Sequence, residues 1–240
     1  MTDEIIFLDE VDSTNSYLKK RCGELPNGVT VTARLQTAGR GRRGHDWAAD
    51  GGMLPMSILL KNPPEAENLT ARAGIAVCEA IESVCEASAS VKWPNDIIIG
   101  SHKVCGILCE SVFFGDCANI IVGIGVNVSQ NEEFFTAAGL PNAGSLLTLT
   151  GSAPERGVLL RAIAEKVKER AALPFSACYD EYKRRLINLG KAVRIISASG
   201  ERSAEAVDVA PNGFLICCDG NGVFEVSSGE VSVRGADGYL

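Results

Sequence analysis

The chain of 240 residues lacks the features that mark secreted and membrane-spanning proteins. No apolar run approaches the roughly 18 residues that a membrane span needs. The acidic start, residues 1–4 (MTDE), has no basic segment followed by an apolar core, as a signal peptide would. The nine cysteines include no C-x-x-C pair and no metal-ligand spacing. We therefore expect reduced thiols in a cytoplasmic protein without a membrane anchor.

The chain also lacks an excess of positive charge. Its formal net charge is −7, whereas proteins that bind nucleic acid neutralise phosphates with lysine and arginine. With 46% hydrophobic and 22% charged residues, the chain can bury a sizeable core and has no composition typical of disorder. Its length indicates one or two domains.

The hydrophobic pattern predicts an α+β domain over residues 1–188. Strand-like runs are predicted at 5–8, 29–35, 54–60, 97–99, 103–110 and 119–128, and helical patterns after Asp12, over 69–84, and around 158–167 and 178–186. A turn at 99–103 looks like a hairpin, which favours antiparallel pairing. Residues 189–240 then show short alternating runs separated by Gly, Asn and Asp. This texture predicts a small β-barrel or sandwich that docks on the first domain.

A loop rich in glycine and arginine follows the second strand-like run. Residues 36–44 read QTAGRGRRG, with three glycines and three arginines. Glycine lets the backbone approach a ligand closely, and Arg40 and Arg42 offer planar charged forks for carboxylate or phosphate oxygens. In an acidic chain, this loop indicates a site for an anionic reaction centre.

Two other interpretations of the loop fail on context. The spacing Gly39-x-Gly41-x-x-Gly44 fits a dinucleotide fingerprint, but that motif opens a helix and has an acidic residue about 20 positions later. Here the loop runs into Trp47 and a Gly-Gly pair, and around Leu60 there is Lys61 and no carboxylate before Glu65. An RNA-binding Arg-Gly segment usually lies in a basic low-complexity tail.

Three more polar groups interrupt the apolar runs. Residues 13–15 (STN) open a helix, and alone they could be a plain helix cap. Residues 92–96 (KWPND) form a rigid turn, and a plain turn is the alternative. Lys103 heads an apolar strand, where it could simply extend to solvent. Gly106 and Gly125 lie inside strand-like runs and mark bulges or close approach of a ligand.

Together these motifs resemble the biotin–protein ligases. The similarity rests, in chain order, on residues 13–15, 36–44, Trp47, 92–96, the pattern Lys103-x-x-Gly106-Ile107, residues 123–127 (GIGVN) and a C-terminal 229–234 (GEVSVR). It covers nearly the whole chain. The resemblance implies a mixed-sheet catalytic domain of the class II aminoacyl-tRNA synthetase/biotin ligase type. A small Src-homology-3-like β-barrel is expected to follow it.

The resemblance also implies a reaction and a set of residue roles. Biotin would be activated by ATP and Mg²⁺ as biotinyl-5′-AMP and transferred to a lysine of a biotin carboxyl carrier protein or domain, of the acetyl-CoA or pyruvate carboxylase type. Catalytic roles are implied for Lys103, Arg42 and Arg40. Biotin contacts are implied for Ser13, Thr14, Asn15, Gln36, Gly39, Arg40, Gly41, Arg42, Lys103 and Gly106, and nucleotide contacts for Arg42, Trp47, Asn95, Lys103, Asn127 and Arg234. Asp96 is expected on the metal side.

The chain departs from the family pattern in two places. It begins almost directly at the catalytic strand, so we expect neither the helix-turn-helix domain of bifunctional members nor DNA binding. His45-Asp46 stands where some relatives carry basic residues. We expect the 36–44 loop to close over the bound intermediate, and neutral or negative side chains at these positions could alter that closure. A lipoate–protein ligase and a non-catalytic biotin-binding regulator are the alternative functions, and a monomer or a homodimer fits the sequence.

Overall fold

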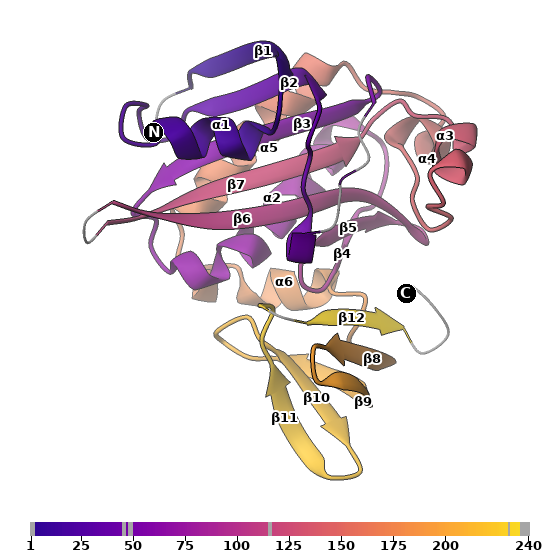
Figure 1. Ribbon diagram of the computed structural model, residues 1–240. Helices are drawn as coiled ribbons and strands as arrows, with labels where there is room; N and C mark the ends of the chain where they lie inside the picture. The colour runs from indigo at the N-terminus through magenta and orange to yellow at the C-terminus, as the bar shows by residue number, and fades with distance from the viewer. Residues whose placement is uncertain (1–2, 45–46, 48–49, 115–116, 230, 236–240) are drawn as a thin grey trace.

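The computed structural model describes residues 3–44, 47, 50–114, 117–229 and 231–235, which form two β-sheets flanked by helices (Figure 1). The strands are β1 (Ile5–Val11), β2 (Thr30–Gln36), β3 (Met53–Lys61), β4 (Ser90–Lys92), β5 (Asp96–Ile99), β6 (His102–Phe114), β7 (Cys117–Asn127), β8 (Lys191–Ser197), β9 (Gly200–Val209), β10 (Leu215–Asp219), β11 (Gly222–Val226) and β12 (Ser232–Gly235). The helices are α1 (Thr14–Arg21), α2 (Leu69–Val84), α3 (Glu132–Ala137), α4 (Leu146–Thr150), α5 (Arg156–Ala171) and α6 (Tyr179–Arg185). Short 3₁₀ turns are η1 (Arg42–Gly44), η2 (Ala66–Asn68) and η3 (Phe175–Ala177).

The larger sheet has seven strands in the order β1-β2-β3-β7-β6-β5-β4. β1 and β2 run parallel, and every other neighbouring pair is antiparallel. The sheet is therefore mixed, and the predicted α+β class is confirmed. The predicted hairpin at residues 99–103 is also confirmed, with Gly100 at its tip in the left-handed region at φ 59°.

Helices cover the two faces of this sheet unequally. The long helices α2 and α5 pack side by side on one face and bury the main core (Figure 1). The short helix α1 lies on the other face, over a smaller cluster that includes Leu18, Val31 and Ile121. Strand residues alternate between the faces. On β7, Val122 and Val126 contribute to the main core, whereas Gly123 and Gly125 point to the face that α1 covers only in part. That uncovered region holds the site.

The smaller sheet has five antiparallel strands in the order β11-β10-β9-β8-β12. The antiparallel sheet fits the expected small Src-homology-3-like β-barrel, although the described strands do not pair into a closed barrel. The sheet lies beneath the larger one, with α6 between them (Figure 1). Lys183 of α6 pairs with Asp208 of β9 at 2.6 Å, and Trp93 Nε1 donates to the carbonyl of Gly213 at 3.1 Å.

Sequence periodicity found every long element but missed three short ones. The helix predicted over 69–84 is confirmed as α2. The missed elements are β4, α3 and α4, which have three, six and five residues. Such lengths are too short for a period to show. N-cap side chains stabilise the two short helices: the Asn131 side chain accepts from Phe134 N at the start of α3, and the Ser145 side chain accepts from Thr148 N at the start of α4.

Two further expectations concern membranes and cysteines. Among the described helices, none is both long and apolar enough to cross a membrane. The eight cysteines whose side chains are described are free, and six of them are buried. Burial raises the pKa of the Cys78 thiol to about 12, which keeps it protonated at neutral pH.

One buried arginine ties α2 to the end of α5. Arg72 is 0% exposed and donates to the carbonyls of Ala171 at 2.9 Å and Leu173 at 2.7 Å. Those two bonds come from Nη1, whereas Nη2 donates to the carbonyls of Pro64 and Glu65 at 2.5 and 2.7 Å. The guanidinium thus satisfies carbonyl groups that would otherwise be buried without a donor.

We predict that Arg72→Met lowers the free energy of unfolding by about 3 kcal/mol, because it strands these carbonyls away from water. Urea denaturation followed by circular dichroism measures the change. Arg34→Met is the matched control, since Arg34 is 64% exposed and pairs with the exposed Asp9. Equal stability of the two variants would contradict this role for Arg72.

Candidate active site

Fourteen of the fifteen predicted site residues line one cavity of about 810 Å³ on the larger sheet, to which β12 of the smaller sheet adds a few residues. They are Ser13, Thr14, Asn15, Gln36, Arg40, Gly41, Arg42, Trp47, Asn95, Asp96, Lys103, Gly106, Asn127 and Arg234. The fifteenth, Gly39, supports the cavity from behind, where a Cβ would come within 3.1 Å of Gln36 Nε2 and of the Trp47 carbonyl. His45 and Asp46 lie outside the described residues.

The floor of the cavity follows one row of residues across the sheet, of which all but Pro55 line the cavity. Pro55, Gly125, Gly106, Asp96 and Lys92 are consecutive register partners on β3, β7, β6, β5 and β4. Residues directly opposite in neighbouring strands point to the same face. The row therefore places two glycines at the centre of the floor and two charged side chains at one end.

One end of the cavity is neutral and polar. Gln36 Oε1 accepts from both Thr14 N at 2.8 Å and Thr14 Oγ1 at 2.9 Å. Ser57 Oγ lies 2.7 Å from Thr14 Oγ1 and 2.5 Å from Asn15 Oδ1, within hydrogen-bond distance of both. Ser13 caps α1, its side chain accepting from Ser16 N. These contacts fix hydroxyl and amide groups that can both donate and accept hydrogen bonds.

Glu110 anchors the same end from below. It accepts from Asn15 Nδ2 at 2.7 Å and pairs with Lys19. Burial alone would raise the pKa of Glu110, but the hydrogen bonds from Lys19 and Asn15 lower it below its ordinary value. Sequence analysis missed Ser57 and Glu110, because a strand serine and a strand glutamate carry no motif.

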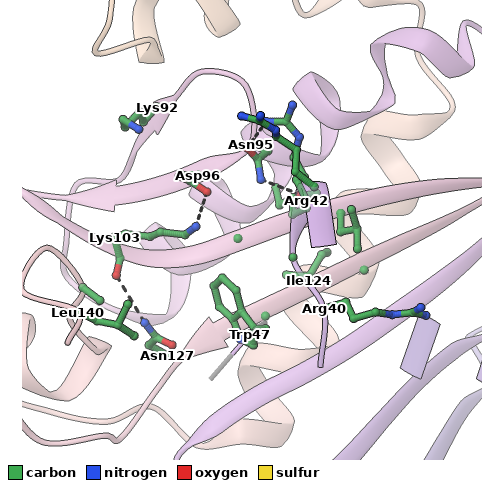
Figure 2. Close-up of a pocket in the computed structure, with 18 of the residues that line it drawn as sticks. Arg40, Arg42, Trp47, Lys92, Asn95, Asp96, Lys103, Ile124, Asn127 and Leu140 are labelled. Carbon is green, nitrogen blue, oxygen red and sulfur yellow. Dashed lines mark hydrogen bonds and ion pairs between the residues drawn. The ribbon is translucent and has the colours of Figure 1, made fainter. Parts of the chain in front are cut away.

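The arginines of the glycine-rich loop point in different directions. Arg40 donates to Ser16 Oγ at 2.7 Å, and Figure 2 shows its guanidinium pointing away from the Arg42–Asn95 cluster. Arg42 donates to Asn95 Oδ1 at 3.0 Å and to the carbonyls of Ser228 and Val231. Burial lowers the pKa of Arg42, with Asp96 opposing the shift. Arg42 therefore joins the loop to the turn before β5 and to the segment before β12.

Trp47 packs flat on the glycines of the floor. A Cβ on Gly106 would lie 2.7 Å from Trp47 Cζ3, and one on Gly125 would lie 2.8 Å from Trp47 Nε1. Only glycine leaves room for the indole at these positions. Lys103 Nζ lies 5.0 Å from the ring centroid, within reach of a cation–π contact. Trp47 Nε1 is buried without a hydrogen-bond partner in the described structure.

The other end of the cavity is cationic around a single carboxylate. Lys103 Nζ pairs with Asp96 Oδ1 at 2.6 Å (Figure 2). Asp96 is the only Asp or Glu among the described residues that line the cavity. Burial lowers the pKa of Lys92 to about 8; Asp96 opposes that shift, and Lys103, Arg234 and Arg42 add to it.

The wall beside Lys103 comes from a segment that sequence analysis left unassigned. Residues 134–143 contribute aromatic and small apolar groups, including Phe134, Leu140 and Pro141. Asn127 holds this wall, because its Nδ2 donates to the Gly144 carbonyl at 3.0 Å. Lys103 N also donates to the Asn142 carbonyl at 2.8 Å. The amide of Asn127 thus positions the backbone around Lys103.

The site therefore offers a neutral polar pocket, a central aromatic platform and a cluster of cations in one cavity. Such an arrangement can hold an organic acid and a polyphosphate side by side. Within the described part of the chain, no group of three or more His, Cys, Asp or Glu side chains could hold a metal ion by itself.

Comparisons with known proteins agree with this geometry. The model of the Biotin/lipoate A/B protein ligase family matches residues 7–127. The bifunctional ligase/repressor BirA of Escherichia coli is 31% identical over 243 residues, which cover 97% of this chain and 75% of the relative. The biotin–[acetyl-CoA-carboxylase] ligase of Mycobacterium tuberculosis is 32% identical over 238 residues, covering 92% and 86%.

Solved structures agree as well. The biotin protein ligase from Aquifex aeolicus, solved in complex with biotin and ATP, superimposes with a TM-score of 0.85 at 31% identity. The match covers 98% of this chain and all of that one. The chain belongs to the biotin/lipoate A/B protein ligase family, and it is an enzyme of the ligase class.

We predict that Gly125→Ala displaces Trp47 from the floor, because the added Cβ would lie within 2.8 Å of the indole nitrogen. The chain has two tryptophans, and Trp93 is 1% exposed. In Gly125→Ala we therefore expect the displaced Trp47, and not the buried Trp93, to shift the emission maximum to longer wavelength. Acrylamide should also quench the variant more strongly than wild type. Gly220→Ala is the control, since nothing lies within 4 Å of its added Cβ. Emission identical to wild type would show that Trp47 does not rest on Gly125.

Proposed function

We propose that the chain activates biotin with ATP and transfers it to a lysine of a carrier protein. The observation that carries the proposal is that one cavity has a neutral polar end and a cationic end, in a chain whose relatives are biotin ligases. In the first step a biotin carboxylate oxygen bonds to the α-phosphorus of ATP and pyrophosphate leaves. In the second, a lysine amine attacks the acyl carbon and AMP leaves.

Biotin would lie at the neutral end. Its ureido group both donates and accepts hydrogen bonds, which suits Ser13, Thr14, Asn15 and Gln36. Gly39 and Gly41 keep the loop close to the ring system, and Gly106 leaves room beside Trp47. The biotin carboxylate would then extend toward Lys103.

The reacting groups would meet at Lys103. A carboxylate and a triphosphate repel one another, so fixed cations offset the repulsion as charge develops in the transition state. Arg42 and Lys103 lie at this point. Arg40 would also contact the carboxylate, after giving up its hydrogen bond to Ser16 Oγ. A side-chain rotation is enough, because Arg40 already lines the cavity.

The nucleotide would occupy the remaining space. The indole of Trp47 offers adenine an apolar stacking surface. Asn95 would serve the nucleotide by accepting a hydrogen bond from Arg42 and so positioning it. Asn127 would serve it by holding the Gly144 carbonyl in the segment beside Lys103. Arg234 on β12 would reach the phosphates from the smaller sheet.

Mg²⁺ fits this site as a companion of the phosphates. In proteins it is usually held by one or two carboxylates together with substrate phosphates, rather than by a full protein cage. Asp96 supplies that single carboxylate. The bound ion would offset phosphate charge, and Lys103 would exchange its contact with Asp96 for one with the reacting oxygens.

The carrier would be a biotin carboxyl carrier protein or domain of an acetyl-CoA or pyruvate carboxylase, encountered in the cytoplasm.

We also propose that residues 1–188 and 189–240 form two domains. The protein would act as a monomer or a homodimer and would not bind DNA.

Biotinylation of a purified carrier domain tests the proposed function. The protein, biotin and Mg·ATP should add one biotinyl group to the carrier, seen as a mass increase, with release of AMP. A carrier whose acceptor lysine is changed to arginine should stay unmodified. An unchanged wild-type carrier, with no biotinyl-5′-AMP formed, would refute the proposed activity.

We predict that Lys103→Met slows biotinyl-5′-AMP formation by about 100- to 1,000-fold, because a charge aimed at the transition state is lost. Single-turnover formation of the adenylate, separated chromatographically, measures the rate. Lys166→Met serves as the control, since Lys166 lies on α5 and pairs with Glu169 at 2.9 Å. A rate within twofold of wild type would remove Lys103 from the reaction centre.

A further inference from the structure

Glu110 is a charged residue beside the cavity to which the mechanism above gives no task. It stands two residues after Leu108 on β6, so the two side chains point to the same face of the sheet. Leu108 and Asn15 line the cavity, and Glu110 is not among its described lining residues. The carboxylate instead accepts from Asn15 Nδ2 at 2.7 Å and pairs with Lys19. The hydrogen bond to Asn15 is therefore its direct link to the cavity.

Asn15 fits into a gap in the surface of the sheet. Ser57, Gly123 and Leu108 are consecutive register partners on β3, β7 and β6. A Cβ on Gly123 would overlap the Asn15 amide, so glycine leaves that space open. The amide is buried there, with Nδ2 also donating to the Leu108 carbonyl at 3.3 Å and Oδ1 lying 2.5 Å from Ser57 Oγ. The nitrogen thus faces β6, and the oxygen faces β3.

The carboxylate of Glu110 decides which way this amide faces. An ionised carboxylate only accepts hydrogen bonds. The NH2 group of Asn15 must therefore turn toward Glu110, and its oxygen toward Ser57. Burial alone would raise the pKa of Glu110, but the hydrogen bonds from Lys19 and Asn15 lower it, which keeps the carboxylate ionised at neutral pH.

The orientation of Asn15 sets what the neutral end of the cavity offers to a ligand. Thr14 Oγ1 donates its proton to Gln36 Oε1, so the Thr14 oxygen is left as an acceptor. Ser57 Oγ has one proton and lies within hydrogen-bond distance of both Thr14 Oγ1 and Asn15 Oδ1. Each of these two oxygens therefore keeps a lone pair for a ligand. The two N–H groups of a ureido ring match such a pair of acceptors.

We propose that Glu110 is a positioning residue for biotin, which holds the Asn15 amide oxygen toward the ureido N–H groups. The inference rests on the proposed function and deepens it. Glu110→Gln keeps the size of the side chain but makes it a donor as well as an acceptor. The Asn15 amide can then turn over and present its NH2 group to Ser57 and to the cavity. A ureido N–H would meet a donor there, and the lost hydrogen bond weakens biotin binding.

The kinetics of adenylate formation separate this role from a structural one. In Glu110→Gln the KM for biotin should rise about tenfold, because one hydrogen bond to the ring is lost. The KM for ATP and the maximal rate should both stay within twofold, because the reaction centre at Lys103 is unchanged. Damage to the fold would instead alter all three quantities.

An exchange of the two partners gives a sharper test. Asn15→Asp alone sets two carboxylates against each other and should raise the KM for biotin more than about tenfold. The double variant Asn15→Asp/Glu110→Gln keeps the total charge and again sets a donor against an acceptor, with an oxygen toward Ser57. Its KM for biotin should be about tenfold lower than that of Asn15→Asp, whereas independent effects would add and make it higher. Recovery is incomplete, because the Leu108 carbonyl loses its donor.

Glu165→Gln is the matched control, because Glu165 is exposed on α5, which packs on the opposite face of the sheet (Figure 1). It should match wild type for biotin and for ATP. A wild-type KM for biotin in Glu110→Gln, equal rises in both KM values, or a double variant no better than Asn15→Asp would overturn the inference. If Glu110→Gln does not fold, the comparison of the double variant with Asn15→Asp decides. Wild-type protein that forms no biotinyl-5′-AMP would instead refute the proposed function.

Discussion

The ion pair between Lys103 and Asp96 is the interaction on which the site depends. It joins β6 to β5 at 2.6 Å, with the two side chains 23% and 14% exposed. A pair this sheltered from water is stable only when its surroundings hold both groups in place. β5 and β6 do so through antiparallel pairing, and Asn127 and residues 142–144 fix the backbone of Lys103. The carboxylate keeps cations together that would otherwise repel.

The shape of the site follows from the row of residues across the sheet. Gly125 and Gly106 are partners at its centre, and without side chains they let Trp47 lie flat on the strands. Larger residues would lift the indole and close the space where acid and nucleotide must meet. Because α1 covers only part of this face, the polar start of that helix becomes a wall of the cavity. Arg42 closes the other side by reaching the carbonyls of Ser228 and Val231.

Much of this could be predicted from the sequence, because long elements and rare motifs carry strong signals. The helix over residues 69–84 follows from apolar residues at helical spacing, and fourteen of the fifteen predicted site residues do line one cavity. The direction of a side chain could not be predicted. Arg40 and Arg42 look alike in a motif, yet one reaches α1 and the other the smaller sheet. Lys92 is set beside Asp96 only by the pairing of β4, a strand too short to show in the sequence.

Exchange of labelled pyrophosphate into ATP, with biotin or lipoate as the added acid, tests the central claim most directly. The cavity is built to bring one acid and one triphosphate together, so exchange must require an acid. We expect label to enter ATP with biotin and Mg²⁺, and not with lipoate or without acid. Exchange with lipoate alone, or equal exchange without any acid, would contradict this account of the site.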